Sequence, residues 1–181
     1  MINFNEYKYV KNILSLDIVD FLSSWSLKNF ILKPDSQTEK AFCVHSKDSE
    51  IYTHLLHYLK PLMEKETNLN LKPIFSYSRI YLGGSELVKH IDGNACEISV
   101  SITLKSYYEN KKYKWPLCMR DIPIVIEEGD GVIYKGIEIE HWRPVFTQPK
   151  ECWHHQVFLH YVNKNGPNQH HAYDQIEQGV K

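Results

Sequence analysis

Two histidines and one aspartate carry the clearest chemical signal in this sequence. His90 and Asp92 are separated by a single residue, so on an extended or turning backbone their side chains can point the same way and close on one metal ion. His141 follows further along the chain, in a predicted loop that flanks a strand. Two imidazoles and one carboxylate form a ligand set that suits Fe(II) and leaves positions open for a substrate and O₂. A surface histidine beside Trp142 is the competing interpretation of His141.

Strands are predicted on both sides of these residues. Residues 97–104 and 154–162 each alternate between apolar side chains and a second, polar set, the pattern of a β-strand with two different faces. The polar faces carry Ser, Thr, His and Gln rather than Lys and Glu, which suits the inside of a small barrel that holds a polar ligand. An ordinary sheet with one face in water explains the alternation equally well.

Helices are predicted before the strands. Residues 15–27 and 49–68 carry apolar side chains at three-to-four spacing. Further short strands are expected at residues 75–82, 122–127 and 132–135. Helices followed by strands indicate an α+β, mainly β fold, with helices packed on one face of an antiparallel sheet. We therefore expect a single domain over residues 1–181, with supporting helices in 1–70 and a polar tail in 164–181.

Composition excludes several classes of protein. The chain has 181 residues and a formal net charge of −1, whereas proteins that bind nucleic acids by neutralising phosphates normally have a basic excess. No stretch approaches the roughly 20 apolar residues that span a bilayer. The four cysteines are widely spaced and the N-terminus lacks the order of a secretory signal, so we expect a cytoplasmic protein with reduced thiols.

The order of these residues resembles the 2-oxoglutarate- and Fe(II)-dependent dioxygenases, most closely the prolyl 4-hydroxylase-like group and its small bacterial and phage members. The resemblance covers roughly residues 74–163, and the matching positions are Tyr81, Gly84, Leu87, His90, Asp92, the turn at Gly129-Asp130, and His141 with Pro144-Val145 close behind. It implies that residues 74–163 form a double-stranded β-helix, or jelly roll, with the N-terminal helices bracing one sheet.

The resemblance also implies an activity and a site. His90, Asp92 and His141 would ligate Fe(II) and form the catalytic centre, and Tyr81 takes the position of the family's cosubstrate-binding tyrosine. In that family O₂ oxidatively decarboxylates 2-oxoglutarate to succinate and CO₂ while a C–H bond of the substrate is hydroxylated. The expected substrate is a prolyl or other residue in a peptide, or a small molecule. Neither a nucleic acid nor a membrane is an expected partner, and the oligomeric state is left open.

One position departs from the family pattern. Members normally present a Lys or Arg near the start of the last strand, to pair with the distal carboxylate of 2-oxoglutarate, and the corresponding residue here is Glu151. We rank Arg79 and His154 equally as replacements, with Lys150 and Arg143 behind them. A guanidinium stays charged at any working pH, whereas a histidine would have to be protonated to anchor the carboxylate by charge.

Two other functions stay open at this point. A metal-free, cupin-like jelly-roll module could bind a ligand in a pocket that His90 and His141 merely line. A zinc hydrolase could use the same three ligands with a water in the fourth place, but it would need a general base, for which Glu86 and Glu97 are available. Stabilisation by Fe(II) and 2-oxoglutarate would argue against the first alternative, and formation of succinate would argue against the second.

Overall fold

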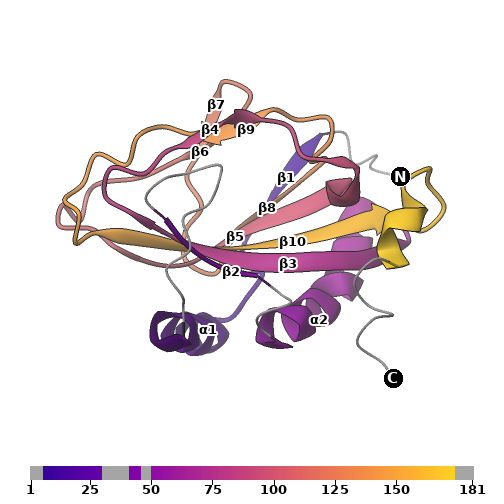
Figure 1. Ribbon diagram of the computed structural model, residues 1–181, viewed down its shortest axis with the longest axis horizontal. Coiled ribbons are helices and arrows are strands. Elements are labelled where there is room, and N and C mark those ends of the chain that lie inside the picture. The colour runs from indigo at the N-terminus through magenta and orange to yellow at the C-terminus, as the bar shows by residue number, and fades with distance from the viewer. Residues whose placement is uncertain (1–5, 30–40, 46–49, 174–181) are drawn as a thin grey trace.

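The computed structural model describes residues 6–29, 41–45 and 50–173. Two antiparallel sheets face each other, and two helices lie against the outer face of the larger sheet (Figure 1). The larger sheet has the strand order β1-β8-β5-β10-β3-β2, and the smaller sheet has the order β4-β9-β6-β7. This is the predicted α+β, mainly β jelly roll, or double-stranded β-helix, with helices bracing one sheet.

The elements have the following bounds. The strands are β1 (Tyr7–Val10), β2 (Ala41–His45), β3 (Leu71–Leu82), β4 (Leu87–His90), β5 (Ile98–Tyr107), β6 (Leu117–Met119), β7 (Ile122–Ile124), β8 (Gly131–Tyr134), β9 (His141–Arg143) and β10 (Trp153–Asn163). The α-helices are α1 (Leu16–Asn29) and α2 (Glu50–Thr67), and short 3₁₀ helices cover Asn94–Cys96 and Gln169–Tyr173. Neither α-helix in this described part of the chain is long and apolar enough to cross a membrane.

The main hydrophobic core lies between the helices and the larger sheet. Both predicted helices are present, and each turns its apolar stripe toward β5 and β10. The apolar face of β5, from Ile98 to Leu104, meets Val19 and Leu22 of α1 and a row of side chains on α2. Burial of this apolar area is the main source of stability in the fold, because each buried Leu- or Ile-sized side chain contributes about 1.5–3 kcal/mol.

The polar faces of the two long strands are buried inside the jelly roll. Ser99, Ser101 and Thr103 on β5, and His154 and Gln156 on β10, are each at most 2% exposed. They face the smaller sheet, because their apolar neighbours along the strands face the helices. The expectation of a polar interior is therefore confirmed, and the alternative of a sheet with one face in water is wrong.

The structure differs from the sequence prediction in several segments. Residues 1–70, expected to supply helices, also contain β1, which pairs with β8, and β2, which pairs with β3. The strand expected over residues 122–127 covers only Ile122–Ile124. His141, expected in a loop, begins β9. These strands have three to five residues, too few for a two-residue period to be distinguished from chance.

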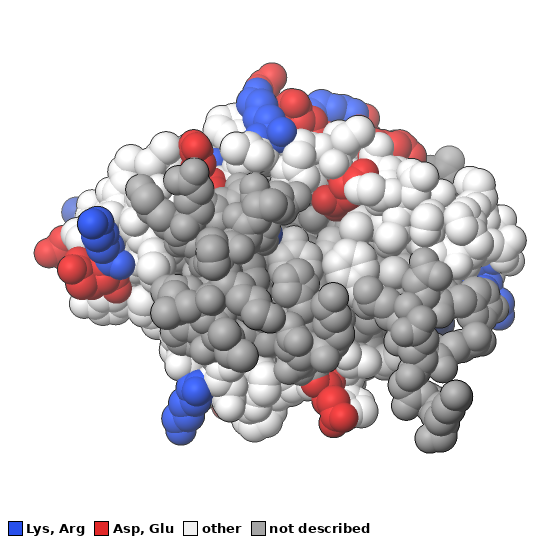
Figure 2. All heavy atoms as spheres, viewed as in Figure 1, with Lys and Arg blue, Asp and Glu red and all other residues white. Residues whose placement is uncertain are grey.

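The expected tail also has some structure. Its first part contains the 3₁₀ helix Gln169–Tyr173, and the amide of Lys164 donates a hydrogen bond of 2.7 Å to the carbonyl of Asn70. On the described part of the face that Figure 2 shows, Lys and Arg side chains are interspersed with Asp and Glu side chains.

Candidate metal centre

The three predicted ligands meet on the inner side of the smaller sheet. His90 ends β4 and His141 begins β9, and the two are cross-strand partners with ring centroids 4.3 Å apart. Asp92 follows β4, and its Oδ1 lies 3.6 Å from the Nε2 atom of each histidine. All three ligand atoms lie within 4.8 Å of one another, so one ion could contact them together.

A β-bulge brings His90 to this place. Leu87 pairs with Arg143, so regular antiparallel pairing would put Lys89 opposite His141, but the register shifts between Leu87 and His90. Val88 and Lys89 are both exposed, as expected for two residues that share one position of the partner strand. The extra residue turns His90 inward, toward Asp92.

Each histidine is held in the tautomer that a metal ligand requires. The Nδ1–H of His90 donates to the carbonyl of Val88 at 2.8 Å, and that of His141 donates to the carbonyl of Ile139 at 2.9 Å. A carbonyl only accepts, so in the neutral rings the proton is on Nδ1 and Nε2 carries none; Nε2 of His141 accepts one long hydrogen bond, of 3.5 Å, from the hydroxyl of Tyr134. Both Nε2 atoms face Asp92, and an Nδ1–H that donates to a backbone carbonyl is the usual arrangement in histidines that bind a metal through Nε2.

The carboxylate of Asp92 is fixed from behind. Its backbone amide donates to the carbonyl of Gly136 at 2.9 Å, and the hydroxyl of Ser99 donates to Oδ2 at 3.3 Å. A Cβ atom on Gly136 would lie 2.4 Å from Oδ2 of Asp92 and 2.3 Å from the carbonyl oxygen of Cys96. The carboxylate therefore rests against backbone that only glycine leaves bare.

Burial makes the charges in this cluster costly without a cation. It raises the pKa of Asp92 to about 6, and together with His141 it lowers the pKa of His90. Burial also lowers the pKa of His141. Two neutral imidazoles and a desolvated carboxylate gain most from a divalent cation, and imidazole with carboxylate suits Fe(II) and Zn(II). The donor set therefore fits the metal that the family resemblance implies.

A second group of candidate ligands is a poorer one. Asp92, Cys96 and His160 also bring their ligand atoms within 4.8 Å of one another. Burial and the nearby Asp92 carboxylate raise the pKa of the Cys96 thiol well above its ordinary value, so the thiol stays protonated. Nδ1 of His160 lies 2.8 Å from the hydroxyl of Ser99. A protonated thiol is a weak ligand, so the set formed with His90 and His141 is the better one.

The residues predicted to hold the cosubstrate are all inside the jelly roll. Tyr81 is fully buried on β3, directly opposite His154 in register. The Nη1 of Arg79 donates to the hydroxyl of Tyr81 at 2.8 Å, and its positive charge partly offsets the rise in the pKa of Asp92 that burial causes. Arg79 and Tyr81 thus lie on the side of the interior that faces the metal ligands.

His154 is buried as a neutral ring. Its pKa is held well below the ordinary value, first by burial and then by the positive charge of Arg143. Nδ1 lies 2.7 Å from the hydroxyl of Tyr108 and Nε2 lies 3.5 Å from that of Thr103. His154 can therefore exchange hydrogen bonds with a ligand, but it brings no positive charge with which to anchor a carboxylate.

Arg143, which the sequence analysis ranked behind Arg79 and His154, is also buried in the interior. It is 1% exposed and lies two residues beyond His141 on β9, so both side chains project from the same inner face of the strand. The signal was available: once His141 is placed on a strand facing inward, Arg143 must face inward as well.

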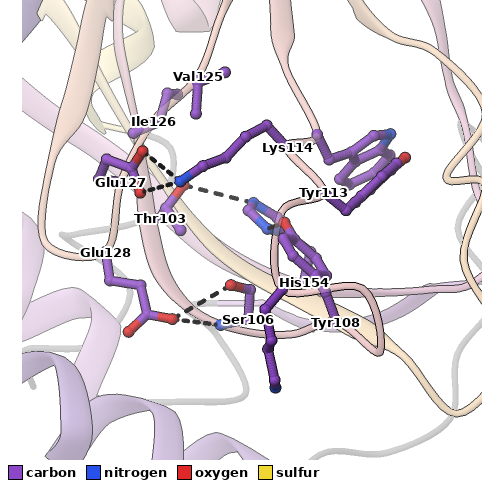
Figure 3. A pocket seen from close by; sticks show the side chains of 12 residues that line it. Thr103, Ser106, Tyr108, Tyr113, Lys114, Val125, Ile126, Glu127, Glu128 and His154 are labelled. Carbon is purple, nitrogen blue, oxygen red and sulfur yellow. Dashed lines mark hydrogen bonds and ion pairs between the residues drawn. The ribbon is translucent and has the colours of Figure 1, made fainter.

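A cavity of about 310 Å³ has His154 and Trp115 among the residues that line it. Figure 3 shows His154 between Thr103 and Tyr108 at its wall, with Lys114 paired to Glu127 across the opening. None of the three candidate metal ligands lines this cavity, so we regard it as separate from the metal centre.

Comparison with known proteins shows similarity in structure but not in sequence. No protein-family profile matches the chain, and no curated protein matches its sequence. The viral collagen prolyl hydroxylase of Paramecium bursaria Chlorella virus-1, solved with 2-oxoglutarate, superposes with a TM-score of 0.67 at 10% identity, over 87% of this chain and 96% of that one.

Two bacterial structures are similarly close. A prolyl-4-hydroxylase of Pseudomonas putida gives a TM-score of 0.63 at 11% identity, over 87% of this chain and 92% of that one. HygX of Streptomyces hygroscopicus, solved with nickel and 2-oxoglutarate, gives 0.66 at 9% identity, over 88% of this chain and 84% of that one. The chain thus has the double-stranded β-helix fold of the Fe(II)- and 2-oxoglutarate-dependent oxygenases, including the prolyl 4-hydroxylases that its motif resembles.

Proposed function

We propose that this chain is an Fe(II)- and 2-oxoglutarate-dependent oxygenase that hydroxylates a C–H bond of a peptidyl substrate, such as a prolyl residue, or of a small molecule. The observation that carries the proposal is the convergence of His90, Asp92 and His141 on one point, with both Nε2 atoms unprotonated and turned toward the Asp92 carboxylate. Fe(II) bound there would supply, with 2-oxoglutarate and O₂, the oxidative chemistry that releases succinate and CO₂.

The residues of the chain bind, orient and shield. The carbonyls of Val88 and Ile139 keep both imidazole rings in the metal-binding tautomer. The hydroxyl of Tyr134 lies 3.5 Å from Nε2 of His141, inside a fully buried wall that keeps bulk water away from that side of the centre. Tyr81, with the guanidinium of Arg79 on its hydroxyl, offers polar contacts to the cosubstrate.

The arrangement supports the oxygenase over the zinc hydrolase. A hydrolase needs a general base close to the metal-bound water. Of the two candidates, Glu86 is exposed, and Glu97 accepts a hydrogen bond of 3.1 Å from the backbone amide of Asn163. A metal-free binding module would have no need for two histidines locked in the same tautomer and facing one carboxylate.

Metal and cosubstrate binding test the proposal directly. Mn(II), a redox-stable substitute for Fe(II), should raise the melting temperature of the metal-free protein, and 2-oxoglutarate should raise it further. With Fe(II) and O₂ the protein should convert 2-oxoglutarate to succinate. His90→Ala and Asp92→Ala should abolish both effects, whereas His57→Ala, at an exposed position on α2, should change neither. Turnover retained in both ligand variants would show that the site is wrong.

A further inference from the structure

A buried arginine that has no carboxylate partner in the described part of the chain lies next to the candidate metal centre. The guanidinium of Arg143 makes one hydrogen bond, from Nη1 to the carbonyl of Trp115 at 2.8 Å, and stacks on the Trp115 ring at 4.6 Å. Its Nε is buried and has no hydrogen-bond partner in residues 6–29, 41–45 and 50–173. Among the described residues, the groups whose charges influence Arg143 are tyrosines and Cys118, and none is a carboxylate.

Burying the charge of Arg143 in this environment is unfavourable in free energy when no ligand is bound. A buried charge normally has an ionic or fully hydrogen-bonded partner, because desolvation without one is strongly unfavourable. A permanent cation that stacks on the Trp115 ring, and whose charge is influenced only by tyrosines and Cys118 among the described groups, therefore indicates that its partner arrives with a ligand. A guanidinium offers two parallel N–H groups to a carboxylate, so the ligand it fits best carries a carboxylate at its inner end.

The spacing of Arg143 from the metal centre fits a dicarboxylate. His141 and Arg143 are two residues apart on one strand, a separation of about 6.6 Å along β9. The carbon chain of a five-carbon diacid has bonds of about 1.5 Å, and because the bonds zigzag, its two end carbons lie roughly 5 Å apart. A molecule that contacts the metal with one end can therefore reach the Arg143 guanidinium with the other.

The other basic groups of the interior are less suitable. Arg79 donates to the hydroxyl of Tyr81, and its charge already acts on the Asp92 carboxylate. His154 is a neutral ring between Tyr108 and Thr103. Lys150 is exposed.

We infer that Arg143, on the same strand as His141, binds the distal carboxylate of 2-oxoglutarate and takes the place of the basic residue expected on the last strand. This inference rests on the proposed function and names the residue that selects the cosubstrate. Arg143 would thereby discriminate a 2-oxo diacid from a 2-oxo monoacid of the same length.

The experiment compares 2-oxoglutarate with 2-oxopentanoate, which has a methyl group in place of the distal carboxylate. Calorimetry on the Mn(II)-loaded protein without O₂ gives the affinity for each acid. The wild-type protein should bind 2-oxoglutarate at least about tenfold more tightly. Arg143→Gln should remove this preference by weakening 2-oxoglutarate alone, and Arg143→Lys, which keeps the charge but loses the two-pronged geometry, should fall in between. Arg79→Gln should alter both affinities by the same factor and leave their ratio unchanged.

A measurement on the wild-type protein tests the inference without any variant. The ratio of the two affinities cancels whatever the metal ligands contribute, so between pH 6 and pH 8 it should stay constant if a guanidinium is the anchor. A ratio that falls as the pH rises would identify a protonated histidine such as His154 and overturn the inference. So would a folded Arg143→Gln variant that keeps the wild-type ratio. Wild-type protein that binds Mn(II) but neither acid would overturn the proposed function together with the inference.

Discussion

The contact between Gly136 and Asp92 leads to a sharp test of the metal centre. In Gly136→Ala the new Cβ would lie 2.4 Å from Oδ2 of Asp92 and 2.3 Å from the carbonyl oxygen of Cys96, where ordinary contacts begin at 3.4 Å. Both oxygens would have to retreat by about 1 Å, which is about half the length of a metal–carboxylate bond. The two segments cannot simply separate, because the amide of Asp92 donates to the carbonyl of Gly136.

We therefore expect Gly136→Ala to weaken metal binding by a factor of about 10 to 100, the usual effect of disturbing the support of a metal ligand. This factor corresponds to about 1.4–2.7 kcal/mol of binding free energy. Overpacking should also lower the free energy of unfolding by about 1–3 kcal/mol. Titration calorimetry with Mn(II) measures the first effect, and urea denaturation of the metal-free protein measures the second.

Gly93→Ala is the matched control. Gly93 is adjacent to Asp92 in the sequence, yet a Cβ atom there would meet nothing within 4 Å, and its φ of −75° suits any residue. The affinity of the Gly93→Ala variant for Mn(II) should equal that of the wild-type protein. A folded Gly136→Ala variant with wild-type affinity would show that the Asp92 carboxylate is not a ligand held against this backbone.

Two further predictions concern stability. Burial lowers the pKa of His155 to about 3, so the unfolded chain takes up a proton below pH 6.5 that the native state refuses, and stability must fall as the pH drops from 6.5 toward 3. The variant His155→Gln can still hydrogen-bond to Ser23 but does not titrate. Between pH 7 and pH 5 its free energy of unfolding, measured by urea denaturation, should fall by about 2 kcal/mol less than that of the wild-type protein. An unchanged pH dependence would contradict this. Leu159→Ala, in the fully buried core, should lower the free energy of unfolding by about 2–5 kcal/mol in the same assay. Leu16→Ala, at a position 63% exposed, should lower it by less than about 0.5 kcal/mol, and equal effects would refute the burial argument.

The long elements were predictable from the sequence because each packs one face over many residues. The apolar stripe of α2 and the alternation of β5 and β10 extend over ten or more residues and meet in one core. Their polar faces also indicated the interior correctly, since Ser99 and Gln156 are buried there. Such patterns are reliable because burying the wrong face would cost free energy in every turn of the helix and in every two-residue repeat of the strand.

The smaller sheet was not predictable in the same way. Its strands β4, β6, β7 and β9 have only three or four residues each, too few to show a period. A strict two-residue period in β4 would also have been misleading, because it puts Leu87 and Lys89 on one face and His90 on the other. Arg143 was ranked low for the related reason that its strand was not recognised. Its burial depends on tertiary packing against Trp115, which no local pattern records.

The register between β4 and β9 determines whether the site exists. Since side chains alternate along a strand, a slip by one residue would turn His90 or His141 toward water. Two hydrogen bonds beyond the strand ends resist such a slip. The amide of Gly84 donates to the carbonyl of Phe146 at 2.8 Å, and the amide of Phe146 donates to the carbonyl of Ser85 at 2.7 Å. With the pairs fixed at this end, the extra residue of the bulge can only be taken up between Leu87 and His90. The turn at Gly84 therefore positions the metal ligand, although it makes no contact with the metal site itself.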